Sequence, residues 1–230
     1  MEIAIRARAL DPALELAALL VEIEPDSPLG RDLMASLLGN KGEIDPATEA
    51  VSALAAASGD RPFFLSQLSY YFAKFPDKKA VLAAIRTVIA PYAALPESRY
   101  ALGVAALLAG EDELARAESL AVLEARPDWA QGAILHAQVL RKLAPGEVIL
   151  FYQSFVAKNP QAKDAWLQLA RELTTAKRNP EARAAFRAAE KRAPADAQLP
   201  YAIGLLALQA GDFAEAETAL RRSLGLGPAD

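Results

Sequence analysis

Residues that commonly carry out chemistry are scarce in this 230-residue sequence. It has one histidine, His136, and no cysteine. A site with two histidines, a thiolate nucleophile, a disulfide and a cysteine-bound zinc ion are therefore excluded. Neither of the common glycine-rich phosphate-binding motifs occurs. His136 could act as a single general base, but it lies in an apolar helical pattern, which favours a packed structural histidine.

The acidic run Glu111, Asp112 and Glu113 follows a glycine at an expected helix start. Carboxylates are favoured there by the helix dipole, which explains them better than general acid and base catalysis does. The sequence thus indicates no catalytic residue, no cofactor and no metal site, and we expect that the chain is not an enzyme.

Two clusters each allow two interpretations. The aromatic cluster comprises Phe63, Phe64, Tyr70, Tyr71, Phe72 and Phe75. Its helical spacing favours packing in the core, and a partner-binding patch is the alternative. The basic cluster comprises Lys177, Arg178, Arg183, Arg187, Lys191 and Arg192. We interpret it as a solvated helix face, and a surface for phosphate or acidic peptides is the alternative.

The composition favours helices. Hydrophobic residues make up 53% of the chain and are mostly Ala and Leu, which are not β-branched. The formal net charge of −4 argues against nucleic acid as a partner. The apolar run that begins at Ala101 is about half as long as a membrane-spanning helix requires, and the first residues lack a signal-peptide pattern.

An apolar pattern recurs about every 34 residues in the second half of the chain. Each repeat has eight characteristic positions: four on a first helix, three on a second helix, and one proline that closes the unit. In the clearest unit these positions hold Trp166, Leu169, Ala170, Leu173, Ala182, Phe186, Ala189 and Pro194. One period later they hold Pro200, Ile203, Gly204, Ala207, Ala216, Leu220, Ser223 and Pro228. Earlier units hold Gly132, Leu135, His136, Val139, Val148, Tyr152, Phe155 and Pro160, and before these Arg99, Leu102, Gly103, Ala106, Ala115, Ser119, Val122 and Pro127.

This pattern resembles the tetratricopeptide repeat, a helix-turn-helix unit of the same period, although Leu173 stands where the family has Tyr. The resemblance implies an all-α fold: an α-solenoid whose antiparallel helix pairs stack into a right-handed superhelix of about six to seven units. Small residues such as Ala170 and Gly204 would let paired helices approach closely, and Trp166 and Phe186 would fill the space between them.

We expect a single solenoid domain over residues 1–230. Its clearer units are 96–128, 129–162, 163–196 and 197–230, its diverged units are 27–59 and 60–95, and a partial unit covers 1–26. Because the chain starts inside a unit and stops two residues after a closing proline, we interpret it as a fragment of a longer bacterial tetratricopeptide repeat protein.

Turn residues support the helix pairs. The dipeptides Asp11-Pro12, Asp45-Pro46 and Asn179-Pro180 predict a helix start with the acceptor at the N-cap and proline at the first helical position. Gly110 and Gly211 predict helix ends with a left-handed residue.

Proteins of this family generally bind peptides or partner subunits in a groove lined by the first helices. The register places Ala133 and Ala137 in this groove, together with the expected contact residues Tyr100, Val104, Leu107, Leu108, Arg141, Leu167, Arg171, Thr175, Tyr201, Leu205 and Gln209. The resemblance therefore implies a non-catalytic protein-protein interaction scaffold. The alternative is an accessory or regulatory repeat domain of a larger enzyme whose catalytic part lies outside this chain.

The expected partner is a protein or peptide, without nucleic acid and without a transmembrane segment. Exposed ends of the solenoid allow a second expectation, self-association into a homo-oligomer. We expect a soluble protein of the bacterial cytoplasm or periplasm.

Overall fold

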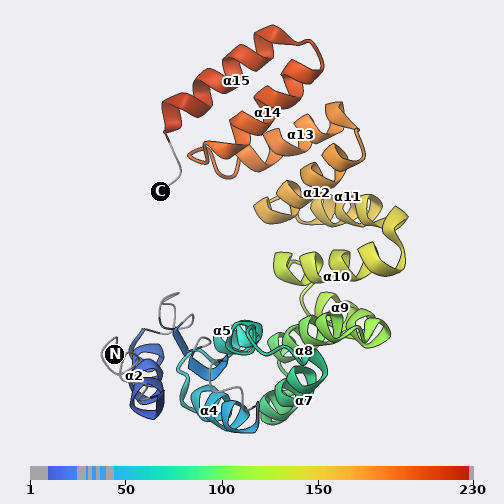
Figure 1. Ribbon diagram of the computed structural model, residues 1–230. Coiled ribbons are helices and arrows are strands. Elements are labelled where there is room, and N and C mark those ends of the chain that lie inside the picture. The colour runs from blue at the N-terminus through green and yellow to red at the C-terminus, as the bar shows by residue number, and fades with distance from the viewer. Residues whose placement is uncertain (1–9, 25–29, 31–32, 35–36, 40–43, 228–230) are drawn as a thin grey trace. The chain divides into compact units, whose positions relative to one another are not determined.

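The computed structural model describes residues 10–24, 30, 33–34, 37–39 and 44–227, and each element in these ranges is helical (Figure 1). The all-α expectation is thereby confirmed for the described residues, which contain no strand. The chain divides into two compact units, Met1–Pro127 and Asp128–Asp230. Within the described ranges, no helix combines the length and the apolar character needed to cross a bilayer.

The structure gives bounds for seven α-helices of the first unit. They are α2 (Leu10–Ile23), α4 (Ile44–Ala57), α5 (Arg61–Ser66), α6 (Leu68–Tyr71), α7 (Lys78–Ile89), α8 (Pro96–Ala109) and α9 (Asp112–Ala125), and the short 3-10 helix η1 (Ala90–Tyr92) follows α7. Helix α7 contacts both α4 and α8, and α8 packs closely against α9. Neighbouring helices therefore stack in chain order, as in an α-solenoid.

Most of the aromatic cluster lies in the core of this unit. The Phe64 and Tyr71 rings stack with their centroids 5.1 Å apart, and both side chains are buried, as is Phe75. The helical segment is divided into α5 and α6 at Gln67, whose N–H bonds to the Phe64 carbonyl three residues back. Burial of these rings confirms the core interpretation for them, whereas the Tyr70 side chain is 51% exposed.

Arg61 joins the end of one helix to the start of the next. Its Nε and Nη2 donate hydrogen bonds to the carbonyls of Ala55 and Ala56, at 3.0 and 2.9 Å, in the last turn of α4. Its guanidinium also lies 5.0 Å from the centre of the Tyr92 ring. A cation at this position is stabilised by the unpaired carbonyls and the negative end of the helix dipole.

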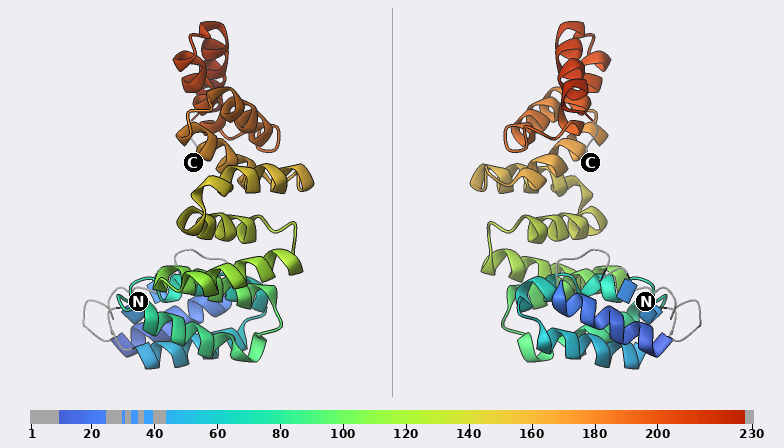
Figure 2. Two further views of the ribbon diagram at one scale, coloured as in Figure 1. Left: turned by 90° about the vertical axis from the view of Figure 1, so that its right-hand side faces the viewer. Right: turned by 90° about the vertical axis from the view of Figure 1, so that its left-hand side faces the viewer.

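The second unit consists of three successive helix pairs with short connections. They are α10 (Ala130–Leu143) with α11 (Val148–Lys158), α12 (Lys163–Thr175) with α13 (Asn179–Glu190), and α14 (Gln198–Gln209) with α15 (Phe213–Leu226); the 3-10 helix η2 (Pro145–Glu147) precedes α11. The paired helices α12 and α13 pack closely, as do α14 and α15, and α13 also contacts α14. Both views of Figure 2 show α14 and α15, coloured red, side by side.

Helix ends follow the sequence signals in part. Gly110 and Gly211 have φ angles of 78° and 75°, so the expected left-handed residues are confirmed. The expected N-caps are wrong by one or two residues, since Asn179 is the first residue of α13 and Asp45 already lies in the first turn of α4. Asn179 donates to the Gln209 side chain at 3.4 Å instead of capping its own helix.

The two large aromatic residues of the repeat 163–196, Trp166 and Phe186, differ in burial. Phe186 is 7% exposed and packs in the core, as expected. Trp166 is partly exposed, and its ring N–H donates to the Pro160 carbonyl at 2.9 Å. The guanidinium of Arg192 lies over the Trp166 ring, 5.7 Å from its centre. The expectation of a buried plug is thus wrong for Trp166, because its polar edge is held at the surface by the loop before α12.

Ion pairs join neighbouring helix pairs within the second unit. Arg183 lies 2.5 Å from Glu215, Arg187 pairs with the same carboxylate, and Arg222 pairs with Glu190 at 2.8 Å. Each pair connects α13 to α15. Because such surface pairs contribute at most about 1 kcal/mol each, they fix the alignment of the second helices more than they stabilise the fold.

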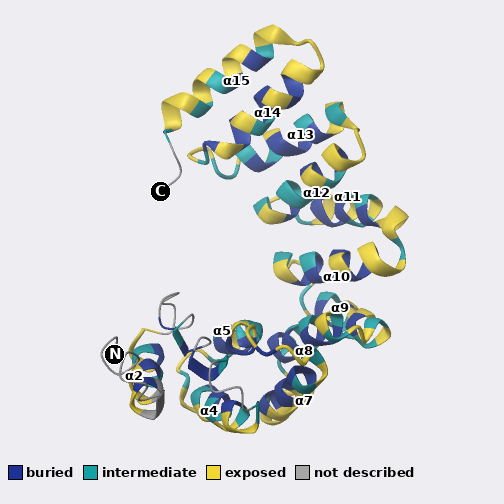
Figure 3. Cartoon of the chain, viewed as in Figure 1, coloured by how far each residue is buried: buried dark blue, intermediate teal, exposed yellow. Residues whose placement is uncertain are grey.

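The outer side of α15 exposes large apolar side chains. Phe213 is 71% exposed and Leu224 is 82% exposed, and Figure 3 shows exposed residues along much of this helix. Self-association through this side of the molecule stays a prediction.

Candidate functional site

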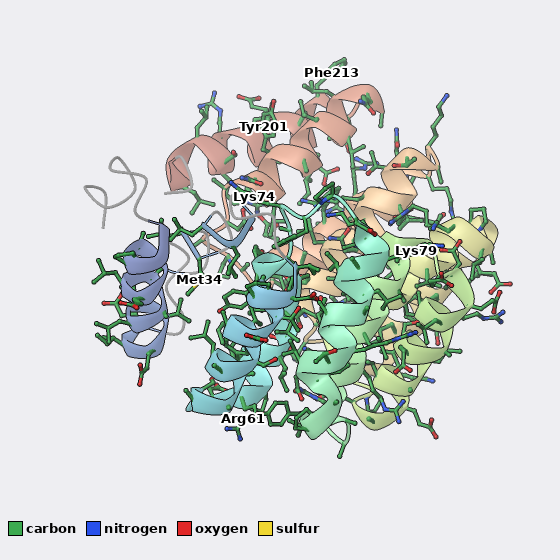
Figure 4. All side chains as sticks on the ribbon, turned by 60° about the horizontal axis from the view of Figure 1, so that its bottom comes forward. Met34, Arg61, Lys74, Lys79, Tyr201 and Phe213 are labelled. Carbon is green, nitrogen blue, oxygen red and sulfur yellow. The ribbon has the colours of Figure 1, made fainter. Side chains whose placement is uncertain are left out.

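Helix α14, a first helix of the second unit, exposes the side chains expected to face a partner. On α14, Tyr201 is 52% exposed, Leu205 is 39% exposed and Gln209 is exposed; Figure 4 labels Tyr201. Their spacing of four residues places them along one stripe of the helix. Large apolar groups beside polar ones on an exposed helix face are typical of protein contact surfaces.

The same positions of α12 hold Leu167, Arg171 and Thr175. Leu167 is partly buried, whereas Arg171 and Thr175 are exposed. The Thr175 hydroxyl donates to the Arg171 carbonyl at 3.1 Å, so it is occupied within its own helix. In the described part of the chain the Arg171 guanidinium forms no ion pair, and it can therefore meet a partner's carboxylate without breaking an internal contact.

Helix α10 departs from the expected lining. Ala133 and Ala137 are completely buried, so these two expected groove positions are wrong. Helix α10 contacts both α11 and α12, and a methyl side chain is covered wherever a neighbouring helix lies close. Arg141 is exposed as expected, but its guanidinium is paired with the carboxylate of Glu172.

In the first unit the corresponding residues lie on α8. Leu108 is 56% exposed, whereas Tyr100, Val104 and Leu107 are partly buried. Burial raises the pKa of the Tyr100 hydroxyl, and the nearby Tyr70 adds to this effect. The tyrosine therefore presents a neutral hydroxyl and part of a ring to the surface.

The residues with catalytic potential lie in structural roles. His136 is 6% exposed, and its ring packs edge-on against Phe151 with the centroids 4.9 Å apart. Glu111 precedes α9 and pairs with Lys79 at 3.8 Å, while Asp112 and Glu113 lie in the first helical turn. Within the described ranges, no group of three or more metal-binding side chains comes together.

Half of the basic cluster is already used inside the chain. Arg183 and Arg187 pair with Glu215, and Arg178 donates two hydrogen bonds to Glu181 at 2.7 and 2.6 Å. These bonds lower the pKa of the Glu181 carboxyl and raise that of Arg178. The interpretation as one uniform docking surface for acidic ligands is therefore weakened, since these cations are neutralised internally.

Tyr152 should make stability sensitive to alkaline pH. It is 1% exposed, and burial raises the pKa of its hydroxyl, to which Arg141 and Glu172 make smaller, opposite contributions. Above pH ~10 the unfolded chain loses this proton while the folded chain keeps it, so stability present below pH ~10 is lost as the pH rises.

We expect Tyr152→Phe to reduce this loss by up to about 1.4 kcal/mol per pH unit above pH ~10. Urea unfolding of both proteins at several alkaline pH values measures the difference. Parallel decreases in the two proteins would contradict the assigned role of burial.

One feature that the sequence analysis missed is a hollow of about 360 Å³ in the second unit. We call it the α11–α13 groove; its apolar lining includes Val156, Ala157, Trp166, Leu169, Ala184 and Ala188. The sequence does contain a sign of this groove. The residues 34 positions after Val156, Ala157 and Ala188 are charged, so the apolar lining is particular to this repeat.

Comparison with known proteins supports the repeat pattern. Residues 152–197 and 167–230 match the model of the tetratricopeptide repeat. No curated protein matches the sequence.

Several solved structures share the fold at low identity. A crystal structure of MamA is 15% identical, covering 70% of this chain and 93% of that chain, with a TM-score of 0.54. MamA residues 41 to the end from Desulfovibrio magneticus RS-1 are 18% identical, covering 73% and 96%, with a TM-score of 0.52. YrrB, described as a TPR protein with an unusual peptide-binding site, is 18% identical, covering 82% and 89%, with a TM-score of 0.50.

Proposed function

We propose that this chain, whose residues 152–230 are tetratricopeptide repeats, is a non-catalytic scaffold that binds a peptide or partner subunit through its first helices. The observation that carries the proposal is the exposed stripe of Tyr201 and Leu205 on α14. Arg171, which forms no internal ion pair among the described residues, occupies the corresponding face of α12. We call these three residues the first-helix stripe.

The chemistry of this stripe supports binding more than catalysis. Tyrosine and leucine supply apolar area, and arginine supplies directed hydrogen bonds, which together are enriched at protein interfaces. YrrB, which has a similar fold, is described as having a peptide-binding site, and this is consistent with the same class of partner. A catalytic role would need clustered titratable side chains, and the single histidine is packed in the core.

Charge placed on this stripe should weaken partner capture. We expect Tyr201→Glu and Leu205→Glu to lose at least about tenfold in affinity, because each puts a carboxylate into an apolar contact. The measurement is a pulldown with tagged protein from an extract of cells that contain the chain, quantified for each variant.

The matched control is Leu120→Glu, which changes a similarly exposed leucine on the second helix α9. It should capture partners as the unchanged protein does. Equal capture by all the variants would remove the support for the first helices as the contact surface.

A further inference from the structure

Two hollows of the second unit occupy equivalent positions one repeat apart. The α11–α13 groove lies among α11, α12 and α13, and a second hollow of about 590 Å³ lies among α13, α14 and α15. The positions equivalent to Val156, Ala157 and Ala188, 34 residues later, hold Glu190, Lys191 and Arg222. The same backbone feature therefore carries an apolar lining in one repeat and a charged lining in the next.

The second hollow is bridged by the chain itself. Arg222 pairs with Glu190 at 2.8 Å, and Arg187 pairs with Glu215, so two ion pairs connect its two walls. In the α11–α13 groove, the positions equivalent to Arg222 and Glu190 hold Ala188 and Val156, and the position equivalent to Arg187 holds Gln153. These residues cannot form such ion pairs, and the groove is left as an apolar channel between two second helices.

The groove has the size and lining of a binding site. Its volume of about 360 Å³ falls within the range of small ligand pockets, roughly 300–1,000 Å³. Trp166 and Leu169 of α12 form its floor, and the walls are mostly Ala and Val. An apolar side chain that entered would bury its surface against Trp166, which is partly exposed in the free protein.

One end of the groove carries positive charge. The Arg192 guanidinium lies over the Trp166 ring and donates to the Ala188 carbonyl, so it stands beside two lining residues. In residues 128–227, which the structure describes throughout, Arg192 forms no ion pair with a carboxylate.

The acidic lining residue is already neutralised. Glu181 lines the groove and accepts both of the Arg178 hydrogen bonds described above. The groove therefore presents an apolar channel with surplus positive charge, which is complementary to an apolar side chain next to carboxylates.

We propose that the α11–α13 groove binds a short segment of a partner protein that inserts a large apolar side chain and carries Asp or Glu beside it. This site lies apart from the first-helix stripe. At 100° per residue, Trp166, Leu169 and Leu173 point to the opposite side of α12 from Leu167, Arg171 and Thr175. The inference thus goes beyond the proposed function and does not depend on it.

The test uses two sets of short, labelled, terminally blocked peptides. Each peptide has a central Leu, Met, Phe or Trp, flanked in one set by mixtures of Asp, Glu, Ser and Gly, and in the other by Lys and Arg in place of the acids. Fluorescence anisotropy measures binding to the intact chain. We expect acidic peptides to bind at least about tenfold more tightly than their basic counterparts.

Two variants locate the site. Ala188→Glu puts a carboxylate into the groove lining and should weaken acidic-peptide binding by about tenfold or more, because it both fills the groove and repels the acidic side chains. Arg192→Glu should weaken the binding of acidic peptides and favour basic ones, because Arg192 lies beside Trp166 and Ala188. Circular dichroism and a thermal melt verify that both variants are folded.

The matched controls are Arg222→Ala, which alters the second hollow, and Leu205→Glu, which alters the first-helix stripe. Both should bind the acidic peptides unchanged. Equal binding of the two peptide sets, or full binding by folded Ala188→Glu, would overturn the proposal. Loss of binding in Leu205→Glu alone would also overturn it, by assigning the peptides to the first helices.

Discussion

Replacing Phe186 with alanine is expected to lower the free energy of unfolding by about 3–5 kcal/mol. Phe186 is 7% exposed on α13, and this helix contacts both α12 and α14. Loss of the ring leaves a cavity at a helix that connects two repeats. Because repeat proteins are stabilised by contacts between neighbours, the loss should also loosen the packing of α14.

Urea unfolding followed by circular dichroism measures this change. Leu150→Ala is the matched control, since Leu150 is 66% exposed on α11 and should change stability by less than about 0.5 kcal/mol. A Phe186→Ala protein as stable as the Leu150→Ala protein would show that the ring does not fill the core between these helices.

The Gly204→Val variant is expected to lose about 2–3 kcal/mol, because the helices α14 and α15 approach too closely for a larger side chain. A Cβ atom at Gly204 would lie 2.7 Å from Cγ and 2.8 Å from Cδ2 of Leu220. It would also lie 3.4 Å from the Ala216 carbonyl oxygen, which belongs to the backbone of α15. The added methyl groups must therefore push Leu220 or the helix itself aside.

Gly225→Val is the matched control for the same chemical change. A Cβ atom at Gly225 meets no atom within 4 Å, and glycine disfavours helices, so this variant should be slightly more stable than the original. Adding Leu220→Ala to Gly204→Val should recover part of the loss, as measured by a double-mutant cycle. Independent, additive effects of the two substitutions would contradict the close approach.

The sequence predicted the helices and their pairing because the signals are local. Ala-rich segments with apolar residues at helical spacing form helices, and Gly110 and Gly211 adopt the left-handed conformation that ends them. The division of the aromatic segment into α5 and α6 was not predictable, because contacts with other helices decide it. The rings of Phe64 and Tyr71 are buried against each other only in the folded unit.

The candidate site was predictable to a smaller extent. Helical spacing identified Tyr201 and Leu205, which are exposed, but it also selected Ala133 and Ala137, which are buried. A repeat register tells which residues share a face, whereas exposure depends on how near the neighbouring helix lies. The same limitation applies to Trp166, which the pattern placed in the core and the structure places at the edge of a groove.

Site-specific photo-crosslinking in the cells that produce the protein tests the central claim most directly. A benzophenone amino acid placed at Leu205 of α14, and in a separate protein at Leu120 of α9, compares two similarly exposed leucines on a first and a second helix. We predict a covalent adduct with another protein at Leu205 and none at Leu120. An adduct at Leu120 without one at Leu205 would contradict binding through the first helices.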